Sequence, residues 1–593
     1  MRPVGGSKIL SASFTAMLAL AFQALGEVRE VFVLHPSGWY EGAFSESTVS
    51  RDEKWLFFTA MGRARIVEVQ SGRDATEEEL AGFDSVRSAA PFGAEGLALL
   101  GTRGGERGWF TPAPSGYVLS SLPPDALPRW NEEGHAAYFR RDEKRKVLHF
   151  RDAEYPVGGE GAGLSWLPGG RGVLALVWHP EGSVEVRAYA LDGSARTLAR
   201  GLDAPFFFTS IGLSADGGRV FLPLVSEAEP MAEARHDPSA DRDLDIYSLD
   251  LDSGDISLVF EGAGDDLSPA LAGKSLFWIS NECVQQVAVF PIEGGAPRVL
   301  VEHGYLPRFR PDGRKLAFTV GDWRMADIPL NLDAMVIDID GEARALSKPR
   351  GIVTGYHEDF TPAWSPDGKW LAYHSHRSPK AVSIFDERGS TDDIYLRRVD
   401  GLSPEIRLTD FGHETGSASW LPDSRRLVFD SQDIGITPAV TRTWVVEIDP
   451  DSGKAVSKKE LLRPAGVRSL ESVAFSPSGR ELALLGEAEN GKAIWVQDVE
   501  KGSLQRLAPY AASTHGGIDW APDERTLIYS ALGAEHMEIF SVTRNQGSWG
   551  EPRRVAAEAD ADLLQPQVSP DGRFIACARV KWTKRLMRKD VLE

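Results

Sequence analysis

A short motif recurs along this 593-residue chain and constrains its fold more than any other feature. The motif is an anchor residue (aromatic or aliphatic), any residue, Pro, Asp or a small residue, Gly, a basic residue and a short apolar stretch. About twelve copies occur between Val49 and Val568, at a mean spacing of about 47 residues. The clearest are FRPDGRKLAF (309–318), WSPDGKWLAY (364–373), WLPDSRRLVF (420–429), FSPSGRELAL (475–484), WAPDERTLIY (520–529) and VSPDGRFIAC (568–577).

Each copy predicts a β-hairpin. Pro presets the backbone for a turn and Asp-Gly tolerates its corner, so two short strands flank the motif. A second pair of strands often follows, as at 393–398 and 405–408. Four strands in about 45 residues make one propeller blade, whose strands are apolar on both sides because both faces pack on neighbours. The sequence therefore predicts an all-β protein of tandem β-propellers.

These copies resemble the PD40 (WD40-like) repeats of the TolB family of propellers, strongly from about residue 305 onward and loosely before it. TolB-like propellers have six or seven blades, so the resemblance implies two six-bladed rings of four-stranded antiparallel blades, at 27–303 and 304–593. One larger propeller is the alternative. The copy at Val568 has little chain left for its outer strands. Closing that ring needs a strand from elsewhere, and 28–34 is the candidate.

The first 26 residues have the pattern of a signal peptide. Arg2 and Lys8 supply positive charge, 9–25 is mostly apolar, and Ala24 and Gly26 place small residues before a cleavage point. This predicts a periplasmic or secreted protein; a membrane anchor is the alternative, although the apolar run is short for a span. We expect no transmembrane segment after this one. The net charge of −21 argues against nucleic acid as a partner.

Several enzyme signatures are absent from the sequence. It contains no G-x-S-x-G nucleophile elbow, no HExxH and no P-loop, and the repeats extend to its last residues, where related propellers carry a hydrolase. The two cysteines, Cys283 and Cys577, lie in strand-like apolar stretches and predict two buried thiols, although a disulfide between them is not excluded. These observations favour a non-catalytic protein.

The loops of a propeller separate onto two faces, because its strands alternate in direction. We call the face with the Pro-Asp-Gly corners the short-turn face. The opposite, long-loop face holds the insertions at about 226–242, 321–333, 374–392 and 431–441. Long loops on a rigid scaffold are the usual carriers of binding function. The seven histidines after residue 300 all map on or near this face.

One blade is the richest in candidate residues. We expect a ligand site from His357, Glu358, Asp359, His374, His376, Arg377, Asp392, Asp393 and His413. Residues two apart in a strand point the same way, about 7 Å apart, so an H-x-H pair presents two imidazoles to one metal or anion. His357, His374 and His376 are the candidate ligands of a divalent metal. A core role for His374, with solvated acidic neighbours, is the alternative.

Two functions follow from these residues. The first is an exported, non-catalytic module that binds a protein or a polar or carbohydrate ligand; TolB-like proteins engage protein partners, and the resemblance implies such a role. The second is a metal-dependent carbohydrate-active enzyme similar to oligogalacturonate lyases, PD40-like propellers that hold a metal with histidines over the channel. Their ligand motif cannot be matched residue by residue. The tryptophans at repeat anchors predict blade core rather than a sugar platform: Trp166, Trp364, Trp420 and Trp520.

Overall fold

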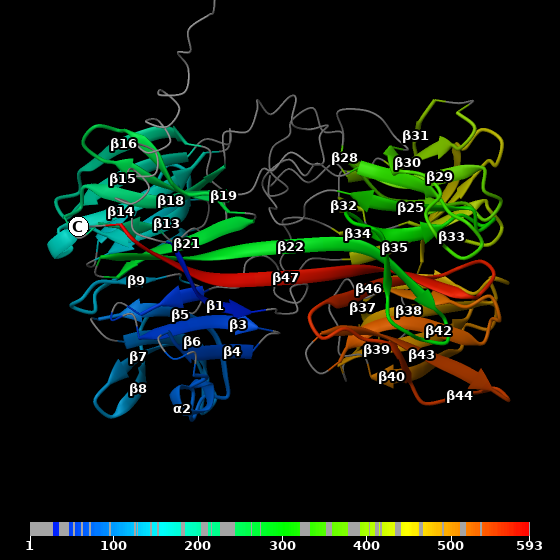
Figure 1. The fold of residues 1–593 in the computed structure, drawn as a ribbon, viewed down its shortest axis with the longest axis horizontal. Helices are drawn as coiled ribbons and strands as arrows, with labels where there is room; N and C mark the ends of the chain where they lie inside the picture. Colours follow the sequence, from blue (N-terminus) through cyan, green and yellow to red (C-terminus); the bar gives the residue numbers. More distant parts are fainter. Residues whose placement is uncertain are drawn as a thin grey trace, which may run out of the picture.

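A computed structural model shows two β-propellers side by side (Figure 1). It describes residues 28–591 apart from 35–46, 203–210, 226–243, 321–332, 352–357, 377–391, 433–440, 510–516 and gaps of five residues or fewer. The regular structure of the described residues is almost entirely antiparallel β-sheet. The exceptions are the four-residue helix α2 (Thr76–Glu79) and a 3-10 turn at Pro168–Gly170.

The N-terminal ring has five blades of its own, each built from consecutive strands with the first strand innermost. The first is β2 (Ser47–Val49), β3 (Trp55–Ala60) and β4 (Arg63–Glu68); the second β5 (Ser85–Phe92), β6 (Gly96–Arg103), β7 (Glu106–Ala113) and β8 (Gly116–Leu119); the third β9 (Arg129–Trp130), β10 (Ala136–Asp142), β11 (Arg145–Phe150) and β12 (Ala153–Pro156). The fourth is β13 (Glu160–Trp166), β14 (Gly172–Trp178), β15 (Val184–Ala190) and β16 (Ala195–Leu202); the fifth β17 (Gly212–Leu213), β18 (Arg219–Val225), β19 (Leu244–Asp250) and β20 (Ile256–Phe260).

The C-terminal ring repeats this plan. Its first blade is β24 (Tyr305–Phe309), β25 (Lys315–Val320), β26 (Asp333–Asp338) and β27 (Arg350–Gly351); its second β28 (Glu358–Trp364), β29 (Trp370–His376), β30 (Asp392–Arg398) and β31 (Ile406–Arg407); its third β32 (Glu414–Thr415), β33 (Ser419–Trp420), β34 (Arg426–Gln432), β35 (Thr441–Ile448) and β36 (Ala455–Leu461). The fourth is β37 (Val467–Phe475), β38 (Glu481–Ala488), β39 (Gly491–Asp498) and β40 (Leu504–Pro509); the fifth β41 (Ile518–Trp520), β42 (Thr526–Leu532), β43 (Met537–Asn545), β44 (Ser548–Trp549) and β45 (Arg553–Ala556).

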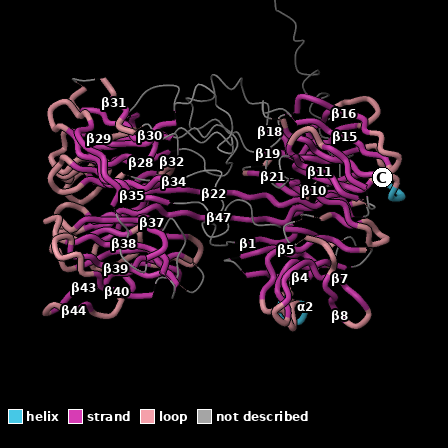
Figure 2. The backbone as a smooth tube through the Cα atoms, turned by 180° about the vertical axis from the view of Figure 1, so that it is seen from behind, coloured by secondary structure: helices cyan, strands magenta, loops and turns pink. Residues whose placement is uncertain are grey.

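The sixth blades of the two rings share one sheet. Two 17-residue strands, β22 (Ser275–Pro291) and β47 (Phe574–Asp590), pair along their whole length and run from one ring into the other (Figures 1 and 2). In the N-terminal ring, β21 (Asp265–Ala272) lies inside them and β1 (Arg29–Leu34) outside. In the C-terminal ring, β46 (Asp562–Val568) lies inside and β23 (Arg298–Val301) outside. Each ring therefore has six blades, and the single larger propeller is excluded.

This sheet corrects one expectation. The segment 28–34 does supply a closing strand, since β1 pairs with β47. Its partners, however, are residues 584–588, in the half of β47 that belongs to the N-terminal ring. The ring that contains Val568 is completed instead by β22 and β23. The expected division at 303 and 304 falls between β23 and β24, and it stays a prediction about folding units.

The shared sheet also fixes which faces of the rings meet. In every blade the second strand runs from the short-turn face to the long-loop face, and the third strand returns. β22 leaves the N-terminal ring as its second strand and enters the C-terminal ring as its third, and β47 does the reverse. The long-loop faces of the two rings therefore face each other (Figure 1). Along β22, Asn281 is the last residue level with the innermost strand of the N-terminal ring, and Gln285 is the first level with that of the C-terminal ring. These residues are four positions apart, so the two faces are about 13 Å apart near the shared sheet.

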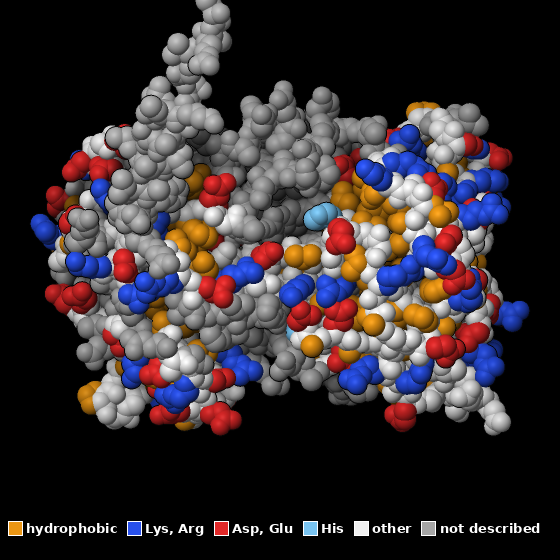
Figure 3. Space-filling model, in the orientation of Figure 1, with side chains coloured by type: hydrophobic (Ala, Val, Ile, Leu, Met, Phe, Trp, Pro, Cys, Tyr) orange, Lys and Arg blue, Asp and Glu red, His pale blue; other side chains and the backbone are white. Residues whose placement is uncertain are grey.

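Charged side chains cover one face of the strand pair between the rings (Figure 3). Arg585 on β47 binds Glu282 on β22 at 2.8 Å and Glu30 on β1 at 3.3 Å. Farther along β47, Arg579 donates to Gln286 at 2.8 Å. The opposite face is buried, and Trp582 is only 2% exposed within a hydrophobic cluster of the C-terminal ring. The two strands are thus fixed by side chains as well as by backbone pairing.

The anchor tryptophans join neighbouring blades. The indole Nε1 of Trp420 donates to the carbonyl oxygen of Ala363 at 3.0 Å, and Trp520 binds Ala474 in the same way at 3.0 Å. In the N-terminal ring, Trp166 repeats the contact with Arg129 at 2.8 Å. Each acceptor lies on the innermost strand of the preceding blade. The anchors are therefore blade core, as the sequence predicts.

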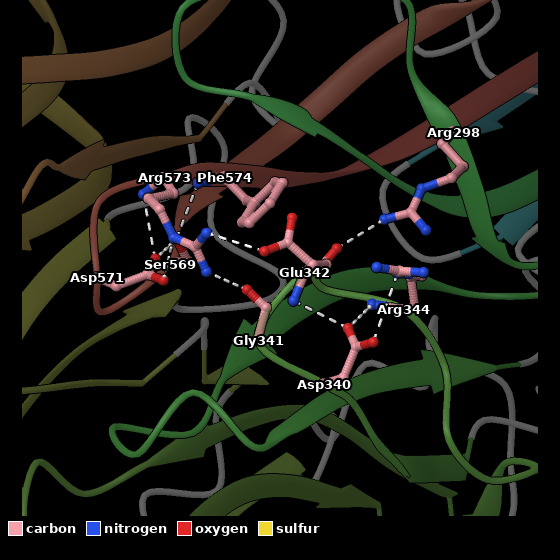
Figure 4. A network of polar contacts seen from close by, with 9 residues as sticks. All are labelled: Arg298, Asp340, Gly341, Glu342, Arg344, Ser569, Asp571, Arg573 and Phe574. Atoms are coloured by element: carbon pink, nitrogen blue, oxygen red, sulfur yellow. Dashed lines mark hydrogen bonds and ion pairs between the residues drawn. The ribbon is translucent and has the colours of Figure 1, made fainter.

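A polar network on the short-turn face closes the C-terminal ring between its sixth and first blades (Figure 4). Arg298 on β23 donates to the carbonyl oxygen of Glu342 at 3.0 Å. Arg573, next to β47, binds the Glu342 carboxylate at 3.1 Å, the Asp571 carboxylate at 2.8 Å and the Gly341 carbonyl oxygen. The sixth blade thereby holds the turn that leaves the third strand of the first blade.

The two cysteines are free thiols. Cys577 is fully buried, as expected, and burial raises the pKa of its thiol. Cys283 is only half-buried, between the rings, where it pairs across the strands with Trp582. The disulfide that the sequence left open is therefore absent from this structure.

Candidate functional site

The second blade of the C-terminal ring carries the sequence-predicted site at its long-loop end. Backbone pairing places Glu358, His376 and Asp392 in one row across β28, β29 and β30. Phe360, His374 and Ile394 lie two residues farther in, on the same face. The backbone register thus has His374 and His376 two residues apart in one strand, and their shared use by a ligand stays a prediction.

His374 lies within the apolar core near the channel. Its side chain is 2% exposed and contacts the Phe360 ring edge-on, with centroids 5.1 Å apart and planes at 87°. Phe360 belongs to the hydrophobic cluster that also contains Tyr305 and Trp582. A ligand that used His374 would have to reach a buried imidazole that packs against Phe360.

The acidic residues of this blade have counterparts elsewhere in the scaffold. The Asp393 carboxylate binds Arg407 at 2.6 Å and accepts a hydrogen bond from Thr409 Oγ1 at 2.8 Å. Acids occupy the same position, second in the third strand, at Glu185, Asp245 and Glu538. Glu185 likewise binds an arginine of its fourth strand, Arg200, at 3.3 Å. These contacts fix third strands in place and favour a structural role for Asp393.

The acid that begins an innermost strand is also a recurring feature. By register, Glu358 corresponds to Asp265 and Asp562 in the shared sheet. Asp562 accepts a hydrogen bond from the backbone N–H of Met537 at 2.8 Å, and Asp265 accepts one from Leu244 at 3.3 Å. Each carboxylate thus secures the third strand of the preceding blade. Asp359, one residue farther along, is fully buried.

His376 and Asp392 form a polar pair at the end of their blade. They are paired across β29 and β30 at the last position before the long loop. The equivalent pair is also polar in three other blades: Asp142 and Arg145, Gln432 and Thr441, and Glu487 and Lys492. It is apolar in three more: Trp178 and Val184, Val225 and Leu244, and Leu532 and Met537. In each of these apolar pairs the third-strand residue is fully buried. Packing of the repeat therefore does not require a histidine and an aspartate at this position.

Part of the predicted site lies outside the described residues. This applies to His357, Arg377 and His413, and to the side chains of Glu358, His376 and Asp392. Over the ranges that are described, no group of three or more His, Cys, Asp and Glu side chains is arranged to hold a metal ion. The metal set of His357, His374 and His376 is not tested by that finding, and it stays a prediction.

Two other polar groups stand out in the C-terminal ring. His536 is buried, with Nδ1 3.5 Å from an Asp562 carboxylate oxygen, where the sequence placed it on the long-loop side. Sequence reasoning missed Arg308, Asp519 and Gln567, which lie near the short-turn end of the channel. The signal that could have found them is the residue before each anchor. In three blades of this ring that residue is small, and in the other three it is Arg, Asp or Gln.

No family model matches the chain. Among curated proteins, an uncharacterized protein of Agrobacterium fabrum is 26% identical over 201 residues, which are 33% of this chain and 60% of that protein. An uncharacterized peptidase of Bacillus subtilis is 20% identical over 230 residues, 38% of this chain and 29% of that protein. The matches thus span less than two thirds of either relative.

Three solved structures are similar at low identity. A putative TolB from Agrobacterium tumefaciens gives a TM-score of 0.36 at 18% identity, covering 50% of this chain and 99% of its own. TolB from Acinetobacter baumannii gives 0.29 at 14%, covering 68% and 78%. An oligogalacturonate lyase in complex with manganese gives 0.33 at 11%, covering 71% and 97%. The fold described above rests on the sheet topology rather than on these scores.

Proposed function

We propose that this protein is an exported, non-catalytic binding module whose site is the long-loop end of the second blade in the C-terminal ring. The observation that carries the proposal is the His376–Asp392 pair next to the buried His374, at a position where three other blades have apolar pairs and three have polar pairs without histidine. His357, Arg377 and His413 are the further candidates from the adjoining loops. The leader-like first 26 residues support export. None of the helices in the described part of the chain has the length and apolar character that crossing a bilayer requires.

The facing rings suggest the shape of the ligand. The long-loop faces of the two rings are about 13 Å apart at the shared sheet. We infer from this spacing that the ligand is an extended polypeptide segment or a sugar chain rather than a globular domain. The net charge of −21 disfavours nucleic acid.

A second candidate function is a metal-dependent carbohydrate-active enzyme. His374 and His376 are two residues apart in β29, and this spacing favours the candidate because side chains alternate along a strand and two imidazoles on one side can share one metal ion. In that case the site would hold a divalent cation through His357, His374 and His376. The cation would polarise a sugar carboxylate.

Photo-crosslinking and metal analysis at the same positions test the two functions. A photo-crosslinking residue at position 376 of the full chain is expected to capture an added ligand from a set of neutral peptides and oligosaccharides. The same residue at Gln432, which ends the second strand of the third blade, is the matched control. Equal capture at both positions, or none at 376, contradicts a site at the second blade.

Metal content then separates the two candidates. Stoichiometric Mn²⁺ or Zn²⁺ in the wild type, lost in His374→Ala/His376→Ala and retained in Gln432→Ala, supports the second candidate. Turnover of uronide oligosaccharides by the metal-loaded protein would establish an enzyme. A wild-type protein that takes up no metal during titration rules the metal-dependent enzyme out and leaves the binding module.

A further inference from the structure

A set of six residues surrounds the short-turn end of the channel in the C-terminal ring. Each directly precedes an anchor on the innermost strand of its blade, and in chain order they are Arg308, Ala363, Ser419, Ala474, Asp519 and Gln567. Ala363 and Ala474 of this set pack in hydrophobic clusters with the anchors of the following blades. Arg308, Asp519 and Gln567 are partly exposed on innermost strands, which line the channel. Three are small. The three larger polar residues belong to consecutive blades, the fifth, sixth and first.

These three polar residues lie on neighbouring strands. Asp519 Oδ2 accepts hydrogen bonds from the backbone N–H of Val568 at 2.8 Å and from Gln567 Nε2 at 3.4 Å. The innermost strand of the sixth blade contacts those of the fifth and the first blades, so Arg308 and Asp519 lie on strands to either side of Gln567. We call Arg308, Asp519 and Gln567 the polar arc.

The polar arc has unused hydrogen-bonding capacity. Arg308 donates to the carbonyl oxygen of Pro307 at 3.2 Å, and no described carboxylate lies within ion-pair distance of it. Burial lowers the pKa of the Arg308 guanidinium and raises the pKa of the Asp519 carboxyl, so each charge is poorly solvated. Gln567 Oε1 is buried and accepts no hydrogen bond from the described residues. Arg308 and Asp519 nevertheless remain partly exposed, so a ligand in the channel can reach them.

The N-terminal ring lacks this arrangement. The residues at its equivalent positions are Thr48, Pro91, Arg129, Ser165, Gly212 and Ala270. Arg129 resembles Arg308 in donating to the carbonyl oxygen of a preceding proline, at 3.3 Å. No acid or amide accompanies it. The repeat therefore does not impose the polar arc.

We propose that the short-turn mouth of the C-terminal channel binds the free C-terminal end of a peptide, with Arg308 holding the α-carboxylate and Gln567 and Asp519 accepting from the backbone N–H beside it. A guanidinium fork matches the geometry of a carboxylate, and such charge-assisted bonds are the strong ones. A bare carboxylate has no hydrogen-bond donor for the buried Gln567 Oε1, whereas a peptide supplies its backbone N–H. This site lies at the opposite end of the ring from the proposed function and does not depend on it.

The overall charge favours a peptide over a polyuronide. Both present a carboxylate beside a hydrogen-bond donor. A chain of uronates, however, carries one negative charge per sugar, and a protein of net charge −21 repels a polyanion. A neutral or basic peptide carries a single carboxylate at its end. The direct test therefore compares these ligands with each other.

Calorimetric titration of the full chain with acetyl-Ala-Ala-Ala, which has a free α-carboxylate, is the experiment. We expect binding to the wild type, and an affinity at least about tenfold weaker for the C-terminal amide of the same peptide. Arg308→Met should weaken binding of the acid by a similar factor. Arg314→Met, an exposed arginine in the corner of the same blade, is the matched control and should change affinity by less than about twofold.

Other outcomes would overturn the proposal. Equal binding of acid and amide, or unchanged binding in Arg308→Met, removes the carboxylate contact. Acetate binding as tightly as the peptide acid reduces the site to a simple anion site, and preferential binding of trigalacturonate assigns it to a sugar acid. Arg308→Met should fold, because it removes a charge without an ion-pair partner. If it does not, thermal stabilisation of the wild type by the acid and not by the amide decides the question.

Discussion

The two rings are completed in different ways, although they share one sheet. In the C-terminal ring the sixth blade consists of two hairpins, β46–β47 and β22–β23. In the N-terminal ring only β21 and β22 form a hairpin, while β47 and β1 arrive separately from distant parts of the chain. Two strands of that blade are held there by pairing and side-chain contacts alone. The N-terminal ring should therefore be the easier one to open.

Truncation after Thr583 should have the largest effect. It removes the residues of β47 that pair with both β22 and β1 in the N-terminal ring, and it leaves Trp582 in place. Hydrogen exchange should show lost protection across 47–272 and retained protection across 305–580. Truncation after Val591 is the control. If both rings lose protection together, the closures are not independent and the comparison fails.

Trp582→Ala should produce the next largest change, in the opposite ring. Trp582 is 2% exposed in the cluster at the long-loop end of the C-terminal channel, so its removal should cost about 3–5 kcal/mol of unfolding free energy. Cys283→Ala, at the residue that pairs with it, should cost less than about 1 kcal/mol because Cys283 is half-buried. Denaturant unfolding measures both. Similar losses would mean that the strand pair, and not the cluster, determines the cost.

Exchange of anchor tryptophans tests the joints inside one ring. Trp420→Phe and Trp520→Phe each lose an indole–carbonyl hydrogen bond, which contributes about 1 kcal/mol. Trp364 is the control, since its Nε1 finds no acceptor among the described residues. Trp364→Phe should therefore cost less than the other two substitutions. Equal melting temperatures for all three variants would show that the hydrogen bond contributes nothing.

The smallest expected effect is one of pH on the first blade of the C-terminal ring. Hydrogen bonds from Arg350 and Lys315 lower the pKa of Asp338 in the folded protein. The stabilisation is present above the unfolded pKa of about 4 and is lost as the pH falls below it toward the folded value. Asp338→Asn should remove less than about 1 kcal/mol at pH 7, as for other exposed ion pairs, and nothing at low pH. A stability difference that persists at low pH would need another cause.

The repeat made most of the fold predictable. WSPDGKWLAY places a strand end at Trp364, a corner after it and a new strand at Trp370, and the structure has all three. The crossing strands were not foreseen, because a repeat identifies hairpins and not the partners of long strands. One signal was available: residues 574–590 contain neither Gly nor Pro, so nothing in that segment ends the strand.

The candidate site was less predictable. The shared face of His374 and His376 follows from strand alternation, which a sequence shows directly. The structural roles of Asp393 and its counterparts depend on contacts with residues 14 or more positions away, as with Arg407. The polar arc joins residues from the first and last blades of the C-terminal ring. Only closure of that ring brings the strands of Arg308 and Asp519 to either side of the sixth blade. Neither relation is visible without the fold.

The crossing of β47 has a consequence for synthesis. Residues 584–590, which the N-terminal ring needs, emerge from the ribosome after every other strand of both rings. The ring that is made first is therefore finished last, and its first and sixth blades wait with exposed apolar flanks, among them Val49 and Phe277. A chain arranged in this way gains from remaining unfolded until it is complete, as it would during passage through a membrane, and from a holding factor that covers those flanks meanwhile.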